Sequence, residues 1–285
     1  MKHVLYLAAL ALIACGSDPA PSGNTTTVSV NGVTRTFRLV VPSTPPQGAM
    51  PLVLAFHGGG GRDSAYPQES QFGQLAEQEG FVMAYPLAEL QAGNEGEWQL
   101  NTTAQTRHDM DFLEALIDQL SAQHNIDANR IYATGYSLGS MFAYELPCQL
   151  SNRFAAIASH AGTMPVNPTS CTPTEPMGIL HLHGTTDTII PYGSTWDWKA
   201  WDSVGTMRDI PSLIEFWRTA YNCSEQSQTP TSSSQHTIHQ GCDGNVRVEH
   251  HQLTGVGHEW PDTINGVSTH QVVWNFLSGF SKSAL

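Results

Sequence analysis

Short apolar runs that alternate with helix-like segments are the feature that most limits what this 285-residue chain can fold into. The run at 51–56 is apolar and ends in His57 and four glycines, as expected of a strand that is buried on both faces and leads into a glycine-rich loop. Similar runs recur at 81–85, 130–134, 154–159 and 177–182, and the segment 246–253 also resembles a strand. Because strands separated by helices usually pair in parallel, the pattern predicts an α/β protein, with a mostly parallel central sheet and helices on both faces.

Helical periodicity lies between these runs. Apolar residues at three- and four-residue spacing predict a helix around 110–120. Shorter helices are expected at 68–79, 138–150, 210–221 and 269–280. Near the start of the domain, the runs 28–30 and 34–41 flank Asn31-Gly32, which predicts a hairpin of two strands. In sheets of this class, functional residues are expected at the carboxyl ends of the strands.

Residues 1–27 are expected to lie outside the folded domain. Residues 1–14 contain Lys2 and then an apolar run, as in a secretory signal peptide, and this run is shorter than the roughly 20 residues of a permanent membrane span. The segment Leu-Ile-Ala-Cys that ends at Cys15 resembles a bacterial lipobox, which predicts a lipoprotein-type signal and lipidation at Cys15. An ordinary signal peptide is the alternative, and both predict an exported protein, extracellular or in the cell envelope. Residues 15–27 would form a flexible tether, and 28–285 a single domain.

The charge balance excludes some partners. The formal net charge is -13, and the chain has only 12 Lys and Arg residues. Nucleic acids and anionic lipids are bound by clustered basic residues. We therefore expect no nucleic-acid partner, and membrane association only through the N-terminal lipid.

Apart from Cys15, the chain has four cysteines: Cys148, Cys171, Cys223 and Cys242. An even number in an oxidising compartment predicts two disulfides, although four cysteines allow three connectivities. Proximity in sequence suggests Cys148 with Cys171 and Cys223 with Cys242, and free structural thiols are the alternative. Because no cysteine lies in a C-x-x-C pattern, we predict no metal site.

A G-x-S-x-G sequence at 135–139 lies directly between a predicted strand and a predicted helix. This is the context of a nucleophile elbow, in which small flanking residues allow the strained turn that exposes the serine, here Ser137. A serine hydroxyl is a weak nucleophile, so it needs a histidine base that is oriented by a carboxylate.

An acid and a histidine follow Ser137 in the required order. Asp187 comes just after the run 177–182, and His258 lies between glycines and Trp260-Pro261 after the run 246–253. The order Ser, Asp, His is that of the α/β-hydrolase fold. Asp187 could instead cap a loop, in which case Asp202 or Asp209 would be the acid.

An oxyanion that forms during acyl transfer needs preorganised N–H donors. We expect one from the backbone of Leu138, which follows the nucleophile. The other would come from the loop after His57, at Gly59 or, failing that, Gly60.

Four motifs in one order give the chain a family resemblance. They read FHGGGG at 56–61, ATGYSLGSM at 133–141, HGTTDTIIPY at 183–192 and GVGHEWP at 255–261. Together they resemble the extracellular polyhydroxybutyrate depolymerase-like and feruloyl esterases, over about 33–280. The resemblance implies an α/β-hydrolase catalytic domain, a triad of Ser137, Asp187 and His258, and an oxyanion hole at Gly59 and Leu138. It also implies the Cys148–Cys171 disulfide.

The resemblance further implies aromatic contacts to the substrate. Trp260 follows the histidine of the triad, where the family tends to have an aromatic residue, and Trp98 lies in a segment similar to the family's substrate-side tryptophan segment but without its neighbouring cysteine. Tyr192 closes the third motif and is the third expected contact. A core position is the alternative for Trp260.

The expected function is carboxylic ester hydrolysis through an acyl-enzyme, without a metal or organic cofactor. Feruloyl esters linked to polysaccharide, small esters and hydroxyalkanoate polyesters are all compatible substrates. Two alternatives are an acyltransferase on the same fold and a non-catalytic surface-binding lipoprotein. The loss of a triad residue would indicate the latter, and all three residues are present.

Overall fold

The computed structural model describes residues 24–59, 71–88, 97–102, 107–169, 171–198 and 204–282. The predicted signal peptide, Cys15, most of the predicted tether, Gly60 and Asp202 lie outside these residues. Within the described part of the chain, no helix is long and apolar enough to cross a bilayer.

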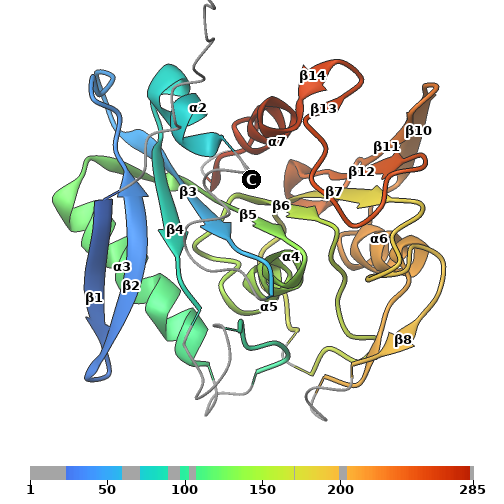
Figure 1. Cartoon of the computed structure of the whole chain (residues 1–285), viewed down its shortest axis with the longest axis horizontal. Coiled ribbons are helices and arrows are strands. Elements are labelled where there is room, and N and C mark those ends of the chain that lie inside the picture. The colour runs from blue at the N-terminus through green and yellow to red at the C-terminus, as the bar shows by residue number, and fades with distance from the viewer. Residues whose placement is uncertain are drawn as a thin grey trace, which may run out of the picture.

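One large sheet organises the molecule (Figure 1). Its ten strands among the described residues run in the order β1-β2-β4-β3-β5-β6-β7-β12-β11-β10. The strands are β1 (Asn24–Val30), β2 (Val33–Val40), β3 (Met50–Phe56), β4 (Val82–Pro86), β5 (Ile126–Tyr136), β6 (Ala156–His160), β7 (Gly178–Gly184), β10 (Glu225–Pro230), β11 (Ser234–Gln240) and β12 (Val248–Leu253). From β4 to β12 neighbouring strands are parallel, and an antiparallel pair extends each edge, β1-β2 on one side and β11-β10 on the other. The prediction of a mostly parallel central sheet is confirmed.

Helices cover both faces of this sheet, as predicted. They are α2 (Phe72–Glu79), α3 (His108–Gln123), α4 (Leu138–Ala143), α5 (Glu145–Gln149), α6 (Ile210–Ala220) and α7 (Thr269–Leu277). In Figure 1, α2 and α7 lie together on one side of the sheet, and α3, α4 and α6 lie on the other. Two short strand pairs complete the described fold, β8 (Trp196–Asp197) with β9 (Thr206–Met207) and β13 (Thr263–Ile264) with β14 (Val267–Ser268).

The N-terminal hairpin forms at the predicted turn but begins earlier than predicted. Asn31 and Gly32 both have positive φ values, 50° and 81°, as a two-residue hairpin turn requires. Strand β1 begins at Asn24 rather than at Val28, because Asn24 still pairs with Leu39 of β2. The predicted tether is therefore too long at its C-terminal end. Its last residues are threonines, whose β-branched side chains favour a strand once a partner strand is present.

The predicted helix over 138–150 is two short helices, α4 and α5, interrupted at Tyr144. Pro147 has no N–H to donate to the carbonyl of Ala143, so one continuous helix would lack that bond. The hairpin of β10 and β11 was not predicted. All residues of β10 are exposed, so its sequence shows no alternation of apolar and polar residues.

The four cysteines form two disulfides, Cys148–Cys171 and Cys223–Cys242. This confirms the expected pairing and rules out free structural thiols at these positions. The first disulfide joins α5 to the segment before β7, and the second joins the end of α6 to the end of β11. Both therefore connect segments on the C-terminal side of the fold.

Candidate active site

Ser137 occupies the sharp turn between β5 and α4. Its backbone has φ 55° and ψ -120°, a strained conformation for a residue with a side chain. A Cβ at Gly135 would collide with the carbonyl oxygen of Gly139, and one at Gly139 would collide with the carbonyl oxygen of Phe56. The glycines predicted to flank the serine are thus required by the close approach of β3, β5 and α4.

The tertiary structure brings Ser137, His258 and Asp187 together in one hydrogen-bonded line. His258 Nε2 lies 2.8 Å from Ser137 Oγ, and His258 Nδ1 lies 2.8 Å from Asp187 Oδ2. The three residues follow β5, β7 and β12, at the carboxyl ends of three parallel strands. The fallback acid Asp209 instead caps the N-terminus of α6, and Asp202 lies outside the described residues.

The loops that carry the acid and the histidine are bonded to each other. The hydroxyl of Thr185 accepts a hydrogen bond from the N–H of Gly255 at 2.9 Å. The hydroxyl of Thr186 donates to the carbonyl of Val256, also at 2.9 Å. These bonds fix the distance between the two loops, so the alignment of Asp187 with the histidine does not depend on their side chains alone.

Asp187 accepts four hydrogen bonds inside the protein. Oδ1 accepts from the N–H groups of Ile189 and Ile190, each at 2.8 Å. Oδ2 accepts from His258, and His183 Nε2 lies 3.3 Å from the same oxygen. Burial alone would raise the pKa of this carboxyl, but the hydrogen bonds from His183, His258 and Ile190 outweigh it and hold the pKa well below its usual value. The carboxylate is therefore ionised at neutral pH.

A buried histidine chain supports Asp187 from behind. His183 Nε2 must carry a proton, because it donates to the carbonyl of Ile190 at 2.9 Å. In neutral His183, Nδ1 then accepts from His181 Nε2, which lies 3.2 Å away. His181 Nδ1 in turn accepts from the hydroxyl of Tyr144 at 2.8 Å. Burial lowers the pKa of His181 well below its ordinary value, so this ring is neutral. The chain keeps the N–H of His183 on the side of the Ile190 carbonyl and of the Asp187 carboxylate, which share it.

His57 orients the loop that follows β3. Its Nδ1 donates to the carbonyl of Gly58 at 2.9 Å, and its Nε2 accepts from the N–H of Ala88 at 3.1 Å. Because the C=O and N–H of a trans peptide point in opposite directions, this bond turns the N–H of Gly59 away from His57. A Cβ at Gly59 would lie 3.5 Å from the side chain of Leu138. The two predicted oxyanion donors are therefore on adjacent segments.

The prediction that Trp98 contacts the substrate is wrong. Its side chain is completely buried, its Nε1 donates to the carbonyl of His57 at 2.9 Å, and its ring stacks on Phe142 with centroids 4.5 Å apart. A side chain without accessible surface cannot touch a substrate. Trp98 instead lies beneath the loop after β3, where its hydrogen bond positions the carbonyl of His57, the first residue of that loop.

Trp260 and Tyr192 differ in how they are placed. Trp260 is half-buried, and its ring stacks on His160 with centroids 4.7 Å apart, near Tyr136. The hydroxyl of Tyr192 is directed inward and lies 2.9 Å from His250 Nε2. Trp260 thus keeps accessible surface beside the histidine loop, whereas the polar end of Tyr192 is already bonded to β12.

Sequence reasoning missed the supporting residues His181, His183 and His57. Two of them lie within the family motifs, His57 directly before the glycines and His183 four residues before Asp187, so the sequence did contain a signal for them. The two-residue spacing of His181 and His183 on a strand also places them on one face of the sheet. Their neighbours Tyr144 and Ile190 come from elsewhere in the chain, and the sequence does not indicate these contacts.

Comparison with known proteins agrees with this fold. The acetyl xylan esterase from Aspergillus awamori superposes with a TM-score of 0.66 over 90% of this chain and 99% of its own, at 17% identity. Similarity at that level shows the fold alone. The chain therefore has the α/β-hydrolase fold.

Sequence comparison identifies the family. Residues 36–193 match the model of the esterase PHB depolymerase family, and the chain belongs to it. A bifunctional acetylxylan esterase/xylanase of Neocallimastix patriciarum is 29% identical over 80% of this chain, and feruloyl esterase B of Piromyces equi is 25% identical over 82%. The chain spans only 31% and 42% of the lengths of these two relatives.

Proposed function

We propose that this protein hydrolyses carboxylic esters, with Ser137 as nucleophile, His258 as general base and Asp187 as the residue that orients His258. The observation that carries the proposal is the line of two 2.8 Å hydrogen bonds from Ser137 Oγ through the imidazole to Asp187. Such a line is what activates a serine hydroxyl in acyl transfer.

In the first half of the reaction, Ser137 Oγ attacks the ester carbonyl and His258 Nε2 takes its proton. His258 then gives this proton to the leaving alcohol, and the acyl group stays on Ser137. In the second half, water attacks the acyl-enzyme, His258 Nε2 takes a proton from water, and the acid leaves as Ser137 regains its proton. Ionised Asp187 stabilises the imidazolium that forms in each half.

The N–H groups of Leu138 and Gly59 are the proposed oxyanion donors. Leu138 is the first residue of α4, and the first N–H groups of a helix have no partner within the helix. The bond from His57 to Gly58 directs the Gly59 N–H away from His57. Removal of one such donor costs about 3–4 kcal/mol of transition-state stabilisation in serine hydrolases.

Acyl groups linked to plant polysaccharide are the proposed substrates, because the two relatives named above are an acetylxylan esterase and a feruloyl esterase. Trp260 supplies an accessible aromatic surface next to His258, on which an aromatic acyl group or a sugar ring would rest. Replacement of Trp260 by Ala should therefore raise KM for methyl ferulate several-fold and leave turnover of p-nitrophenyl acetate nearly unchanged.

Export is part of the proposal. The two disulfides suit an oxidising compartment, and residues 1–14, followed by Cys15, are typical of a lipoprotein signal. A protein held at the cell surface by lipidated Cys15 would act on soluble fragments that reach the envelope.

The test is hydrolysis of acetylated xylan, methyl ferulate, p-nitrophenyl acetate and a hydroxybutyrate oligomer by the wild type, Ser137→Ala and the control Ser29→Ala. Ser29 is exposed on β1, away from the site. We expect turnover that Ser137→Ala abolishes and Ser29→Ala retains, and an acyl adduct on Ser137 by mass spectrometry. Turnover that survives Ser137→Ala would overturn the assignment. Added sugar acceptors that become acylated would instead show an acyltransferase.

A further inference from the structure

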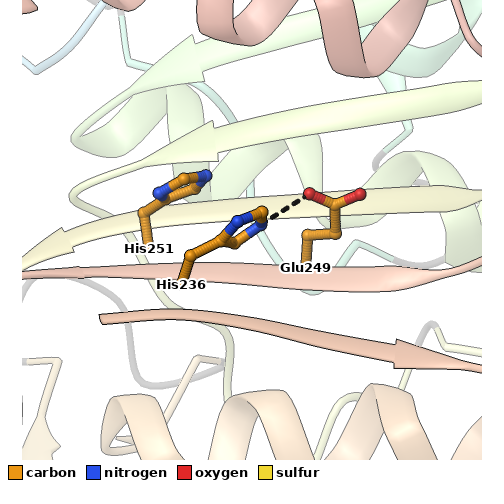
Figure 2. Close-up of side chains that lie close together, drawn as sticks. All are labelled: His236, Glu249 and His251. Carbon is orange, nitrogen blue, oxygen red and sulfur yellow. Dashed lines mark hydrogen bonds and ion pairs between the residues drawn. The ribbon is translucent and has the colours of Figure 1, made fainter. Parts of the chain in front are cut away.

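Three side chains with metal-binding atoms lie together on the antiparallel edge of the sheet, outside the candidate active site. His236 of β11 pairs directly with His251 of β12, and Glu249 lies two residues before His251 on the same strand. Residues two apart on a strand share a face, and directly paired residues on neighbouring strands do too. Figure 2 shows the three side chains projecting from the two strands on the same side.

The metal-binding atoms of this cluster are close enough to share one ion. One nitrogen of each histidine and one carboxylate oxygen all lie within 4.8 Å of one another. His236 Nε2 donates to Glu249 Oε2 at 2.8 Å, and the two imidazole rings are 3.9 Å apart between centroids. Zinc holds such ligands at about 2.0–2.2 Å, so rotation of the imidazole rings and loss of the His236 Nε2 proton would bring all three atoms onto one ion.

His251 gives an independent indication of a ligand. The residue is only 7% exposed, and within the described residues its buried Nδ1 has no hydrogen-bond partner. Buried polar atoms in native proteins nearly always have partners, so an orphan requires an explanation.

The carboxylate of Glu249 is held in place by a second contact. Arg247 bonds to Oε1, which leaves Oε2 on the side of the histidines. The guanidinium of Arg247 also lies over the rings of Phe276 and Phe280, at 5.3 and 4.8 Å from their centroids. A ligating carboxylate whose other oxygen is bonded in this way is typical of the outer shell of a metal site.

A cavity of about 240 Å³ adjoins the cluster, between the sheet and α7. Its lining combines the three side chains with Val272 and Phe276 of α7. The cavity gives an ion a path from solvent and leaves room for water as a fourth ligand, which completes a tetrahedral site with three protein ligands.

We propose that His236, Glu249 and His251 bind a divalent transition metal, with zinc as the best fit. Two imidazoles and one carboxylate suit zinc, whereas calcium and magnesium prefer sites made entirely of oxygen ligands. The metal would cross-link β11 to β12, the strand that leads into the loop of His258. The sequence did not predict this site because strand pairing alone brings His236 beside the other two ligands.

The test is isothermal titration of the metal-stripped full chain with zinc chloride, and with calcium chloride as the comparison ion. The variants are His236→Gln and His251→Gln, with His124→Gln as a matched control, because His124 lies at the end of α3 outside the cluster. Each variant lacks a single histidine, so a loss of affinity in the two cluster variants that the control does not share reports on the cluster. Far-ultraviolet circular dichroism checks that each variant is folded.

We expect one zinc per chain for the wild type and His124→Gln, an affinity at least tenfold weaker in each cluster variant, and no comparable binding of calcium. A crystal soaked in zinc should show an anomalous peak between the three side chains. Zinc should also raise Tm of the wild type as its concentration increases, because it binds the folded state. Equal zinc affinity in His251→Gln and wild type, equal affinity for calcium, or an anomalous peak elsewhere would overturn the proposal.

Discussion

Mild acid should destabilise this protein strongly, because five histidines are buried in neutral form. Burial lowers the pKa of His160 and His250 to about 3, that of His251 and His270 to about 4, and that of His181 well below its ordinary value. None of the five is more than 7% exposed. On unfolding, each ring reaches water and recovers a pKa of about 6.5.

The direction of this pH dependence follows from proton uptake on unfolding. Below about pH 6.5 the unfolded chain binds protons at these rings and the native chain does not, so the free energy of unfolding falls as pH falls. From pH 7.5 to 5.5, each group lowers the free energy of unfolding by the equivalent of about one tenfold change in the unfolding equilibrium constant, and the five together lower it by roughly 7 kcal/mol. This figure depends on the unfolded pKa alone as long as the native values stay near or below 4. It is comparable to the whole stability of a typical domain, about 5–15 kcal/mol.

Urea unfolding followed by tryptophan fluorescence at pH 7.5 and 5.5, with a chelator present, measures this difference. The midpoint should drop sharply at pH 5.5, and His270→Gln should reduce the pH dependence by about one fifth, since it removes one of the five groups. His124→Gln is the matched control, because His124 lies at the end of α3 and is not one of the five buried histidines. Equal unfolding free energies at the two pH values would show that the native histidines are protonated and refute the reasoning.

Three further outcomes concern the candidate active site. Asp187→Asn should lower kcat for p-nitrophenyl acetate by roughly three to four orders of magnitude with little change in KM, because the amide would favour the wrong tautomer of His258. A loss of kcat under tenfold would contradict the role assigned to Asp187. His183→Phe should lower kcat about tenfold and leave KM unchanged, because the carboxylate of Asp187 loses one hydrogen bond. A change in KM alone would argue against a positioning role for His183. Gly139→Ala should yield little folded protein, because the added Cβ would collide with the carbonyl oxygen of Phe56. A normal yield of soluble protein with a native circular dichroism spectrum would refute that collision.

Much of the fold could be predicted from local sequence because the signals are local. Apolar runs at 51–56 and 177–182 became the buried strands β3 and β7. The hairpin turn could be predicted as well, because Asn and Gly tolerate the positive φ values that Asn31 and Gly32 adopt there. The role of Ser137 could be predicted for the same reason, because the strand, the two glycines and the helix that form the nucleophile elbow are contiguous in the chain.

The sequence by itself thus determined the N-terminal hairpin, the strands of the parallel sheet and the three loops that carry a serine, an acid and a histidine. Only the tertiary structure decided how side chains from distant segments meet. It buried Trp98 under the loop after β3, although its sequence neighbourhood indicated a substrate contact. It also paired the polar strand β10, and it placed His236 beside His251 through strand register. These outcomes depend on packing between residues far apart in the chain, and local propensity and periodicity contain no information about those partners.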